Sequence, residues 1–442
     1  MPSFLVQTLG CKLNQLESEA ITDAFLQAGF GIYNQASGSD LYPSLIIVNT
    51  CTVTSKADQK ARRVIRKALR DYPGSRIIVT GCYAQLNRDE LLKLDTVKPV
   101  QRLFVISKDS ILGMAEYLLN DDIAGASFES GVPSSQFAFN PKVFSSHTRS
   151  FLKIQDGCNN HCTYCRIRLA RGPSISLEAE QVLERLKILE KDHAEAVIAG
   201  VNISQYCDIS GRSEVNLAGL LEYLLSGTEK ISLRLSSLAP GSVDENLAEV
   251  LSHNRIRPHF HLSIQSGSKK ILERMGRGYD SQTAERAAAL LRCAKADPFL
   301  ACDIITGFPG ETHAEFKETL AMCERIGFAW IHVFPYSKRQ GTAAFSYTGA
   351  VHEADVTERV QQLTALAKKG RAEYVRRWLG CEVEVLLETD SKSQSSGYSR
   401  GVSENYLKVL VKTEGAMPLP GTMMKCRLLT EGDFEDFDAQ GR

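Results

Sequence analysis

Three cysteines stand close together near the middle of the chain, at the spacing Cys158-x3-Cys162-x2-Cys165. They follow a short apolar run at residues 151–155 and a glycine, so they are expected on a loop directly after a strand. Three thiolates on one tight loop suit a [4Fe–4S] cluster, whose four irons normally take four cysteines. The fourth iron then has no local protein ligand and could bind a small molecule, as catalytic metal sites keep an open position.

This motif, with Tyr164 immediately before its last cysteine, resembles the signature of the radical S-adenosylmethionine (SAM) enzymes. The resemblance implies that SAM binds the open iron through its amino and carboxylate groups. One electron from the cluster then splits SAM into methionine and a 5′-deoxyadenosyl radical. A zinc knuckle or a structural cluster is the alternative, although zinc loops usually carry a fourth Cys or His at fixed spacing and His161 is poorly placed.

Three further cysteines each follow a short apolar run: residues 3–9 lead to Cys11, residues 45–49 to Cys51 and residues 76–80 to Cys82. The runs are too short for helices and rich in β-branched residues, as buried parallel strands are. Helical patterns follow the first two runs, which predicts a parallel α/β sheet. Because ligands gather at the carboxyl ends of such strands, the three cysteines can converge on a second cluster. Small buried core residues are the alternative.

Two three-cysteine sets, one spread over an α/β domain and one in a CxxxCxxC loop, resemble the methylthiotransferases, a branch of the radical SAM enzymes. The flanking words are similar to those of the threonylcarbamoyladenosine tRNA methylthiotransferases: TLGCKLNQLESE at residues 8–19, NTCTVT at residues 49–54 and GCYAQ at residues 81–85. The words CKLN and CTVT distinguish this family from its sister families.

The resemblance implies conversion of N6-threonylcarbamoyladenosine, at position 37 of tRNA, to its 2-methylthio derivative. It implies two [4Fe–4S] clusters and SAM as cofactors, with the second cluster delivering sulfur to C2 of the adenine. The implied partners are the tRNA anticodon loop, a sulfur source and an electron donor such as a flavodoxin or ferredoxin. Alternatives are a sister enzyme acting on isopentenyladenosine tRNA or a ribosomal-protein aspartate, and a non-catalytic iron–sulfur protein for electron transfer or RNA binding.

The chain of 442 residues exceeds the size at which single cores stop growing, so several domains are expected. An α/β fold class is predicted throughout most of the chain. The predicted parts are a flavodoxin-like parallel α/β domain (1–115), a linker rich in Ser, Gly, Pro and Phe (116–147), a radical SAM (β/α)6 partial barrel (148–378) and a small β-barrel (379–442). The last of these resembles the OB-like TRAM domain.

Six strand-like runs predict the partial barrel: residues 151–155, 196–199, 231–235, 260–264, 300–305 and 330–334. Helical patterns lie between them, one of them at residues 177–189 with Ser176 as its expected cap. Active-site residues of such folds lie on the loops after strands. By resemblance, the positions that help to hold SAM are Gly200, Ser236, Gln265 and Ile305, with the Tyr164 backbone at the adenine.

A strongly basic helical pattern spans residues 55–70, directly after Cys51. Its basic residues, among them Lys60, Arg63, Arg66 and Lys67, could contact RNA phosphates or form a solvated face.

Three strand-like runs predict the last domain, at residues 381–387, 406–411 and 423–429. Residues 381–442 carry seven basic and eleven acidic side chains, so the main contact with RNA is expected elsewhere.

One departure from the family pattern follows Cys165, where this chain reads Arg166-Ile167-Arg168-Leu169 in place of an Ile-Pro pair. These arginines are expected to add positive charge near the substrate.

The sequence has no run of 18 apolar residues, so no membrane span is predicted, and the charged residues in the first 30 positions are unlike a signal peptide. Twelve cysteines then favour a reducing cytoplasm and metal binding over disulfides. The six cysteines without ligand spacing are expected to be structural: Cys207, Cys293, Cys302, Cys323, Cys381 and Cys426.

Overall fold

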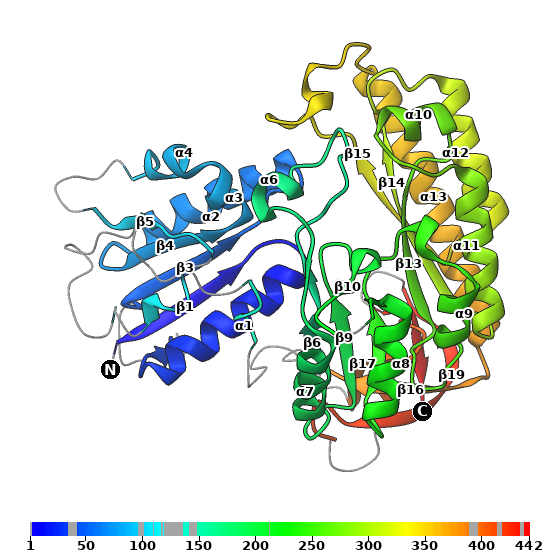
Figure 1. The fold of residues 1–442 in the computed structure, drawn as a ribbon, viewed down its shortest axis with the longest axis horizontal. Helices are drawn as coiled ribbons and strands as arrows, with labels where there is room; N and C mark the ends of the chain where they lie inside the picture. The colour runs from blue at the N-terminus through cyan, green and yellow to red at the C-terminus, as the bar shows by residue number, and fades with distance from the viewer. Residues whose placement is uncertain are drawn as a thin grey trace.

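The computed structural model describes residues 2–33, 42–95, 101–108, 110–115, 118, 136–140, 148–211, 213–388, 397–412, 418–433 and 437–442. The N-terminal domain forms the left-hand lobe in Figure 1, and the rest of the chain builds the right-hand lobe. The N-terminal lobe and the upper part of the other lobe are parallel sheets covered by helices. This arrangement follows from the alternation of short apolar and amphipathic runs.

The N-terminal domain contains one five-stranded parallel sheet in the order β2–β1–β3–β4–β5. This is the flavodoxin-like order that the sequence predicts. The central strand β3 (Leu45–Thr50) is buried along its whole length, which explains its unbroken apolar run. The other strands are β1 (Ser3–Thr8), β2 (Gly31–Ile32), β4 (Arg76–Gly81) and β5 (Leu103–Val105).

Helices cover both faces of this sheet. Alternate residues of β3 and β4 enter two separate core clusters, one with α1 (Lys12–Gln27) and the other with α2 (Ser55–Asp71). Two short helices that the sequence did not predict, α3 (Cys82–Leu86) and α4 (Arg88–Leu92), follow β4. The three strands β1, β3 and β4 therefore end side by side, each just before one of the N-terminal cysteines.

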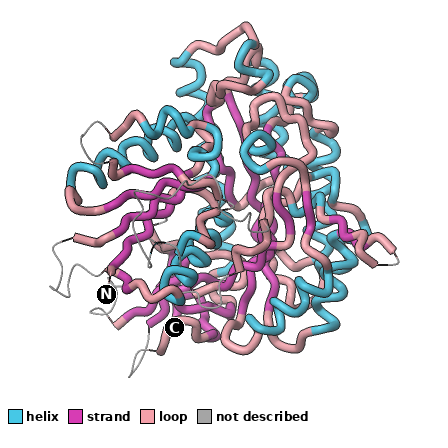
Figure 2. The backbone as a smooth tube through the Cα atoms, turned by 60° about the vertical axis from the view of Figure 1, so that its left-hand side comes forward, coloured by secondary structure: helices cyan, strands magenta, loops and turns pink. Residues whose placement is uncertain are grey.

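Six further parallel strands run in chain order through two groups of three, β6–β9–β12 and β13–β14–β15. Single bridges, Leu233 to Ile256 and Leu238 to Leu262, link the two groups. The helices pack on the outside of this curved sheet (Figure 2). The predicted (β/α)6 partial barrel is confirmed, with strands β6 (Ser150–Lys153), β9 (Glu195–Ala199), β12 (Ser232–Leu235), β13 (His259–Gln265), β14 (Phe299–Thr306) and β15 (Trp330–Pro335).

The helices of the partial barrel are α6 (Ile167–Arg171), α7 (Ala179–Leu189), α8 (Leu217–Gly227), α9 (Glu245–Leu251), α10 (Lys269–Arg274), α11 (Ser281–Ala294), α12 (His313–Ile326) and α13 (Glu353–Trp378). The predicted cap of α7 is wrong, because Glu178 takes the N-cap position and the Ser176 hydroxyl accepts from the Cys207 N–H at 2.9 Å. Short pieces complete this part: β7 (Gln155–Asp156), β8 (Ile175–Ser176), β10 (Cys207–Asp208), β11 (Val215–Asn216) and 3-10 turns at Ile203–Gln205, Pro240–Ser242 and Ala343–Ser346.

The last part of the chain is a closed barrel in the order β16–β17–β18–β20–β19. The sequence predicted a small barrel from three strands, whereas the structure has five. The two additional strands were not predicted because β17 is polar and β20 has only three residues. One pair, β18 with β20, is parallel and the others are antiparallel. The strands are β16 (Glu382–Leu387), β17 (Tyr398–Ser403), β18 (Lys408–Lys412), β19 (Met423–Glu431) and β20 (Ala439–Gly441).

Most of the predicted linker at 116–147 lies outside the described residues. Two of its phenylalanines are described and buried, Phe137 in the core of the partial barrel and Phe139 in the core of the N-terminal domain. None of the described helices is both long and apolar enough to cross a lipid bilayer.

Candidate active site

The three N-terminal cysteines meet at one edge of the first sheet. Negative charge on Cys11 or Cys82 raises the pKa of the Cys51 thiol, as expected when the three thiols lie close together. Gly10 has φ +115°, and a Cβ at this position would lie 2.4 Å from Cβ of Cys51 and 2.8 Å from its sulfur. Gly81, before Cys82, has φ +93° and leaves no room for a Cβ beside Asn49. Glycine thus allows two of the loops to approach Cys51 and its strand closely.

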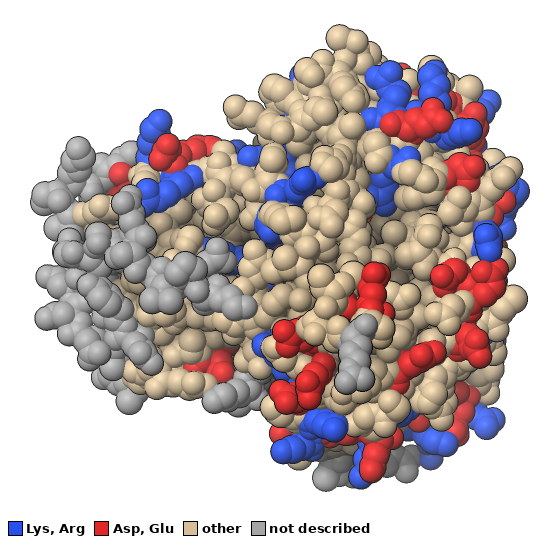
Figure 3. Space-filling view, in the orientation of Figure 1, with Lys and Arg blue, Asp and Glu red and all other residues tan. Residues whose placement is uncertain are grey.

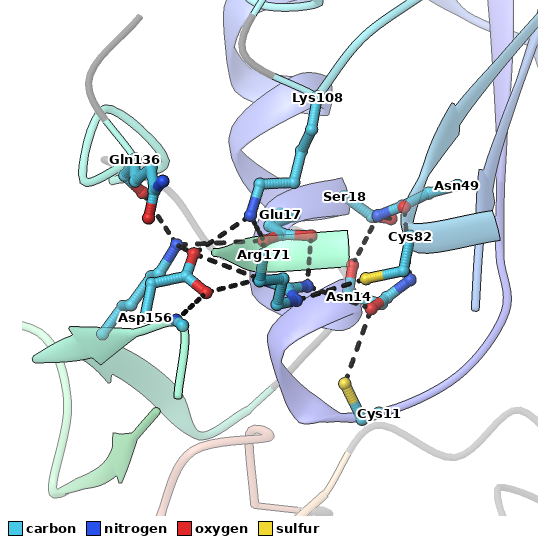
Figure 4. A network of polar contacts seen from close by, with 12 residues as sticks. Cys11, Asn14, Glu17, Ser18, Asn49, Cys82, Lys108, Gln136, Asp156 and Arg171 are labelled. Carbon is cyan, nitrogen blue, oxygen red and sulfur yellow. Dashed lines mark hydrogen bonds and ion pairs between the residues drawn. The ribbon is translucent and has the colours of Figure 1, made fainter. Parts of the chain in front are cut away.

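Two asparagines, which lie close to Cys11 and Cys82 in Figure 4, tie the strand ends together. The Asn14 amide donates to the Leu9 carbonyl at 3.0 Å, to the Thr50 carbonyl at 3.0 Å and to Asn49 Oδ1 at 3.2 Å. The Asn49 amide donates back to the Asn14 carbonyl and to Ser18 Oγ. The Cys11 thiol donates to Asn14 Oδ1 at 3.5 Å. This buried network fixes the Cys11 loop against the Cys51 loop.

The CxxxCxxC loop is held at both ends by backbone contacts. Gly157 has φ +69°, and a Cβ there would lie 1.8 Å from the Pro173 carbonyl oxygen. The Cys158 N–H donates to the Gly172 carbonyl at 3.1 Å, and the Thr163 hydroxyl donates to the Arg274 carbonyl at 2.8 Å. His161 is exposed and turns toward Arg168.

Each cysteine set has an arginine that donates to one of its sulfurs. Arg277 donates to Sγ of Cys162 at 3.2 Å, and Arg171 donates to Sγ of Cys82 at 3.2 Å. The Ile167 N–H also donates to Sγ of Cys165 at 3.4 Å. Hydrogen bonds to ligand sulfurs are among the factors that set the reduction potential of an iron–sulfur cluster. These donors stabilise thiolate sulfur.

The burial of the thiols fits metal-bound cysteines. Burial raises the pKa of Cys51 and of Cys165 to about 12 and also raises the pKa of Cys82. Thiolates at these positions need positive charge close by, which iron supplies. Within the described part of the chain, no three Cys, His, Asp or Glu side chains stand close enough to hold a single metal ion. Each cysteine of a [4Fe–4S] cluster binds a different iron, so its sulfurs stand farther apart than the ligands of one ion.

A buried charge network joins the N-terminal domain to the residues on either side of the CxxxCxxC loop (Figure 4). Arg171, the last residue of α6, pairs with Glu17 of α1 at 2.9 Å and with Asp156 of β7 at 3.1 Å. Lys108 pairs with both carboxylates at 3.0 Å, and Lys153 pairs with Asp156. Three cations thus face two carboxylates, and a Cys82 thiolate would neutralise the remaining positive charge.

The charges of this network lie in a dry environment. Each of its five side chains is buried, and Asp156 has no exposed surface. Burial alone would raise the pKa of Asp156, but Arg171, Lys153 and Lys108 outweigh burial and hold that pKa far below its usual range. Burial also opposes the charge of Glu17, and Arg171 with the two lysines lowers its pKa. Both carboxylates are therefore ionised, and they bind the N-terminal domain to the partial barrel.

The family departure at Arg166 makes contacts with the N-terminal domain that the sequence did not predict. The Arg166 guanidinium donates to Asn87 at 3.2 Å and to Thr52 at 3.5 Å, and lies 3.9 Å from Asp58. Arg339 donates to the same Thr52 hydroxyl at 2.6 Å and to Asp58 at 2.7 Å. Arg166 therefore docks the CxxxCxxC loop onto the N-terminal domain, where it shares the single carboxylate of Asp58 with Arg339.

The positions expected to hold SAM lie in order along the carboxyl edge of the partial barrel. Gly200 follows β9, Ser236 follows β12, Gln265 ends β13 and Ile305 lies one residue before the end of β14. Ile305 and Tyr164 pack against one apolar cluster formed by Ile271, Met275, Phe308 and Ala344.

Two of these positions show features of ligand-facing residues. Gln265 has φ +76°, a strained backbone for a residue with a side chain, and such strain clusters at functional sites. The Ser236 hydroxyl is buried and has no hydrogen-bond partner among the described residues. Gly200 has a packing role, because a Cβ there would lie 3.0 Å from Gln155 Oε1. These observations are compatible with a ligand above β12 and β13.

The basic residues of α2 are exposed. Lys60, Arg63 and Lys67 recur at helical spacing on one face, with Arg66 beside them, and none has a recorded ion pair among the described residues. On the face shown in Figure 3, Lys and Arg are mixed with Asp and Glu over much of the right-hand lobe.

Sequence reasoning missed the residues that connect the two sites: Asn14, Glu17, Asn49, Lys108, Lys153, Asp156, Arg171, Arg277 and Arg339. Two of these residues, Asn14 and Glu17, are polar side chains on the buried face of α1, as is the neighbouring Ser18. A charged residue on a buried helix face needs a partner, but the sequence does not say which residue it is.

Two family models match the chain, Uncharacterized protein family UPF0004 over residues 3–101 and Radical SAM superfamily over residues 152–323. The fold is similar to a solved radical S-adenosylmethionine methyltransferase, TsrM from Kitasatospora setae with cobalamin and a [4Fe-4S] cluster bound. The TM-score is 0.51 at 16% identity, over 76% of this chain and 75% of that chain. The fold and the CxxxCxxC site define a radical SAM protein with an additional N-terminal α/β domain.

Full-length relatives narrow this class. The chain is 37% identical to threonylcarbamoyladenosine tRNA methylthiotransferase MtaB of Treponema pallidum, over 98% of this chain and 99% of the relative. It is 34% identical to the protein of the same name in Bacillus subtilis, over 98% and 95%. Identity to the tRNA-2-methylthio-N(6)-dimethylallyladenosine synthase of Methylacidiphilum infernorum is 29%, over 94% and 90%. The chain belongs to the threonylcarbamoyladenosine tRNA methylthiotransferase family.

Proposed function

We propose that the protein methylthiolates C2 of N6-threonylcarbamoyladenosine at position 37 of tRNA. One observation carries the proposal: two sets of three cysteines lie at the ends of separate parallel sheets, and the buried Arg171 network joins the two domains that carry them. A single-cluster radical enzyme has no need of the second set. The relatives with the same two-domain arrangement bear the threonylcarbamoyladenosine name over nearly their full length.

The C–H bond at C2 of adenine is too weakly acidic for an ordinary base, so a cofactor must supply the chemistry. When bound, a [4Fe–4S] cluster and SAM supply a radical, and a second [4Fe–4S] cluster holds the sulfur to be transferred. Cys158, Cys162 and Cys165 would hold the first cluster. Cys11, Cys51 and Cys82 would hold the second cluster. Arg277 and Arg171 donate to one sulfur of each set and so stabilise the bound thiolates.

The proposed SAM site lies over the carboxyl ends of β9 to β14. The buried Ser236 hydroxyl has no hydrogen-bond partner in the described part of the chain, so it is available to bind a polar group of SAM. The strained backbone at Gln265 presents its peptide groups in a fixed direction. Tyr164 and Ile305 share one apolar wall that suits an adenine face, and Gly200 keeps the loop after β9 close to Gln155.

The target base must leave the stack of the anticodon loop to reach the cysteines, which a single-stranded loop allows at low cost. The exposed basic side chains of Lys60, Arg63, Arg66 and Lys67 contact the tRNA phosphates.

The four segments proposed as domains are 1–115, 116–147, 148–378 and 379–442. A cytoplasmic protein of this kind requires an electron donor such as a flavodoxin or ferredoxin, and a sulfur source.

The test uses the purified protein with both clusters reconstituted, SAM, a reductant and a sulfide source. Its substrates are two tRNAs that carry threonylcarbamoyladenosine or isopentenyladenosine at position 37. We expect the 2-methylthio product from the first tRNA alone, measured by mass spectrometry of the nucleosides. Product from the isopentenyl tRNA alone would assign the sister activity, and SAM cleavage without product from either tRNA would overturn the proposal.

A further inference from the structure

Lys12 is a charged residue with no polar partner beside a proposed cluster ligand. It directly follows Cys11 and is half-buried. No hydrogen bond or ion pair is recorded between its ammonium group and any described residue. It is also the first residue of α1, whose first turn holds no acidic residue and no side-chain cap. Because the N-terminus of a helix carries partial positive charge, a lysine there is unfavourable unless an anion is present.

The surroundings of Lys12 are rich in positive charge. Its Nζ lies 5.9 Å from the ring centre of Tyr406, which also has Arg149 at 5.8 Å and Arg234 at 5.2 Å. Tyr406 has φ +68° on the turn between β17 and β18, where it stacks on His259 at 4.0 Å between ring centres. The C-terminal barrel thus inserts an aromatic ring among three cations.

Two of these three cations are already neutralised. Arg149 pairs with Glu388 at 2.7 Å, and Arg234 binds Glu195 through two hydrogen bonds of 2.7 and 2.9 Å. Only the Lys12 ammonium lacks a carboxylate among these described residues. An aromatic face alone is a weak partner for a desolvated ammonium group. The arrangement therefore leaves room for one more negative charge.

Tyr406 links Lys12 to the strands of the partial barrel. Lys12 Nζ lies 5.9 Å from the centre of the Tyr406 ring, and that ring lies 4.0 Å from the ring of His259 on β13. The positive charge of Lys12 contributes to the lowered pKa of His259 and of His332 on β15. His332 lies 5.3 Å from the His261 ring, and His261 contacts Asp303 of β14 at 3.2 Å. Polar side chains thus line the wall opposite Lys12. An anionic group that binds Lys12 would lie between the N-terminal cysteines and these three strands.

We infer that Lys12 binds the carboxylate of the threonylcarbamoyl group and thereby selects this substrate. The inference rests on the proposed function. The threonyl part of the nucleoside is attached through its amino group and keeps a free carboxylate. In adenine, C2 and C6 flank N1, and C6 carries N6, so C2 and the N6 substituent lie on the same edge of the base. A C2 atom held at the N-terminal cysteines therefore directs the N6 substituent toward the residues beside them, of which Lys12 is one.

The same lysine discriminates against an uncharged substituent. An isopentenyl group has no carboxylate and would bury the Lys12 ammonium without a partner. Such unpaired groups reject a wrong ligand more strongly than extra contacts favour the right one. A charge-assisted hydrogen bond in a half-buried site corresponds to roughly a 10- to 100-fold difference in affinity.

The test measures binding of anticodon stem–loop RNAs to the reconstituted holoenzyme without reductant. One RNA carries threonylcarbamoyladenosine, and the other carries its methyl ester, which removes the negative charge. We expect the wild type to bind the free acid roughly 10- to 100-fold more tightly. Lys12→Met should bind both RNAs with the affinity of the ester, and Lys12→Arg should restore part of the difference. Lys67→Met is the control, which should weaken both RNAs equally.

Iron content and circular dichroism establish that Lys12→Met retains its clusters and fold. If this variant still prefers the free acid as strongly as the wild type, the inference is overturned. Equal wild-type affinity for both RNAs also overturns it. Methylthiolation of the free-acid RNA by the reduced wild type is measured in parallel. Product without discrimination rejects the role of Lys12 alone, whereas a complete lack of product rejects the proposed function.

Discussion

Arg171 donates from Nε to Sγ of Cys82 at 3.2 Å, across the junction of two domains. The arginine ends α6, the helix that follows the CxxxCxxC loop, and the cysteine begins α3 of the N-terminal domain. The same guanidinium binds Glu17 and Asp156, one from each domain. The two cysteine sets are thus positioned relative to each other by one buried side chain.

Replacing Arg171 with Met should destabilise the protein and weaken the N-terminal cluster. The change removes the hydrogen bonds that the Arg171 guanidinium donates to Cys82, Glu17 and Asp156, and the loss of one hydrogen bond to a charged group costs about 1.5–3 kcal/mol. Urea denaturation of the metal-free protein should show this loss. Iron should fall from about eight to about four atoms per chain after reconstitution. A variant with wild-type stability and wild-type iron content would contradict this role.

A second contact between the domains can be tested at Arg339. Its guanidinium is buried against Asp58 and Thr52, so Arg339→Ala leaves a largely buried carboxylate with only the more distant Arg166. We expect a loss of about 3 kcal/mol in the free energy of unfolding. Arg286→Ala is the matched control, because it breaks an equally short but exposed pair with Glu245. The control should not move the denaturation midpoint, and equal effects of both changes would refute the argument.

His259 should make the stability of the protein depend on pH. Burial, reinforced by Arg234 and Lys12, lowers the pKa of His259 well below its usual value. Below about pH 6.5 the unfolded chain binds a proton that the folded protein excludes, so stability falls by up to about 1.4 kcal/mol per pH unit. Above that pH the histidine is neutral in both states and the effect vanishes. In His259→Phe the urea midpoint should fall less between pH 7 and pH 5.5; an unchanged fall would contradict the prediction.

The basic face of α2 should set the salt dependence of tRNA binding. Lys60→Gln with Arg63→Gln removes two exposed charges that have no recorded protein partner among the described residues. The slope of log affinity against log salt should fall by roughly 1–2. Lys187→Gln, on the exposed side of α7, is the control and should leave the slope unchanged. If the two α2 changes alter neither affinity nor slope, α2 is a solvated face.

The sequence was informative where a local pattern determines the structure. The β-branched runs before Cys11, Cys51 and Cys82 predicted three parallel strands, and parallel strands end together. The six strands of the partial barrel were located within two residues of their observed bounds, because each is a continuous apolar run. The polar strand β17 and the short β20 lack such a run and were missed.

The polar connections between domains could not be predicted from one sequence. Arg171 and Glu17 are 154 positions apart, and no periodicity relates them. Arg166 illustrates the same limit, since its charge suggested a contact with the substrate, whereas the fold places Asp58 and Asn87 beside it. Local patterns determine the elements, but long-range charge partners follow only from the packed structure.

The central claim is methylthiolation of threonylcarbamoyladenosine by two cysteine sets, and nucleoside mass spectrometry of cellular tRNA tests it most directly. Cells that lack the gene should accumulate threonylcarbamoyladenosine and lose its 2-methylthio form. The wild-type gene should restore the product, and a Cys51→Ala variant that still binds about four irons per chain should not. Unchanged tRNA in cells that lack the gene, or full rescue by Cys51→Ala, would contradict the account.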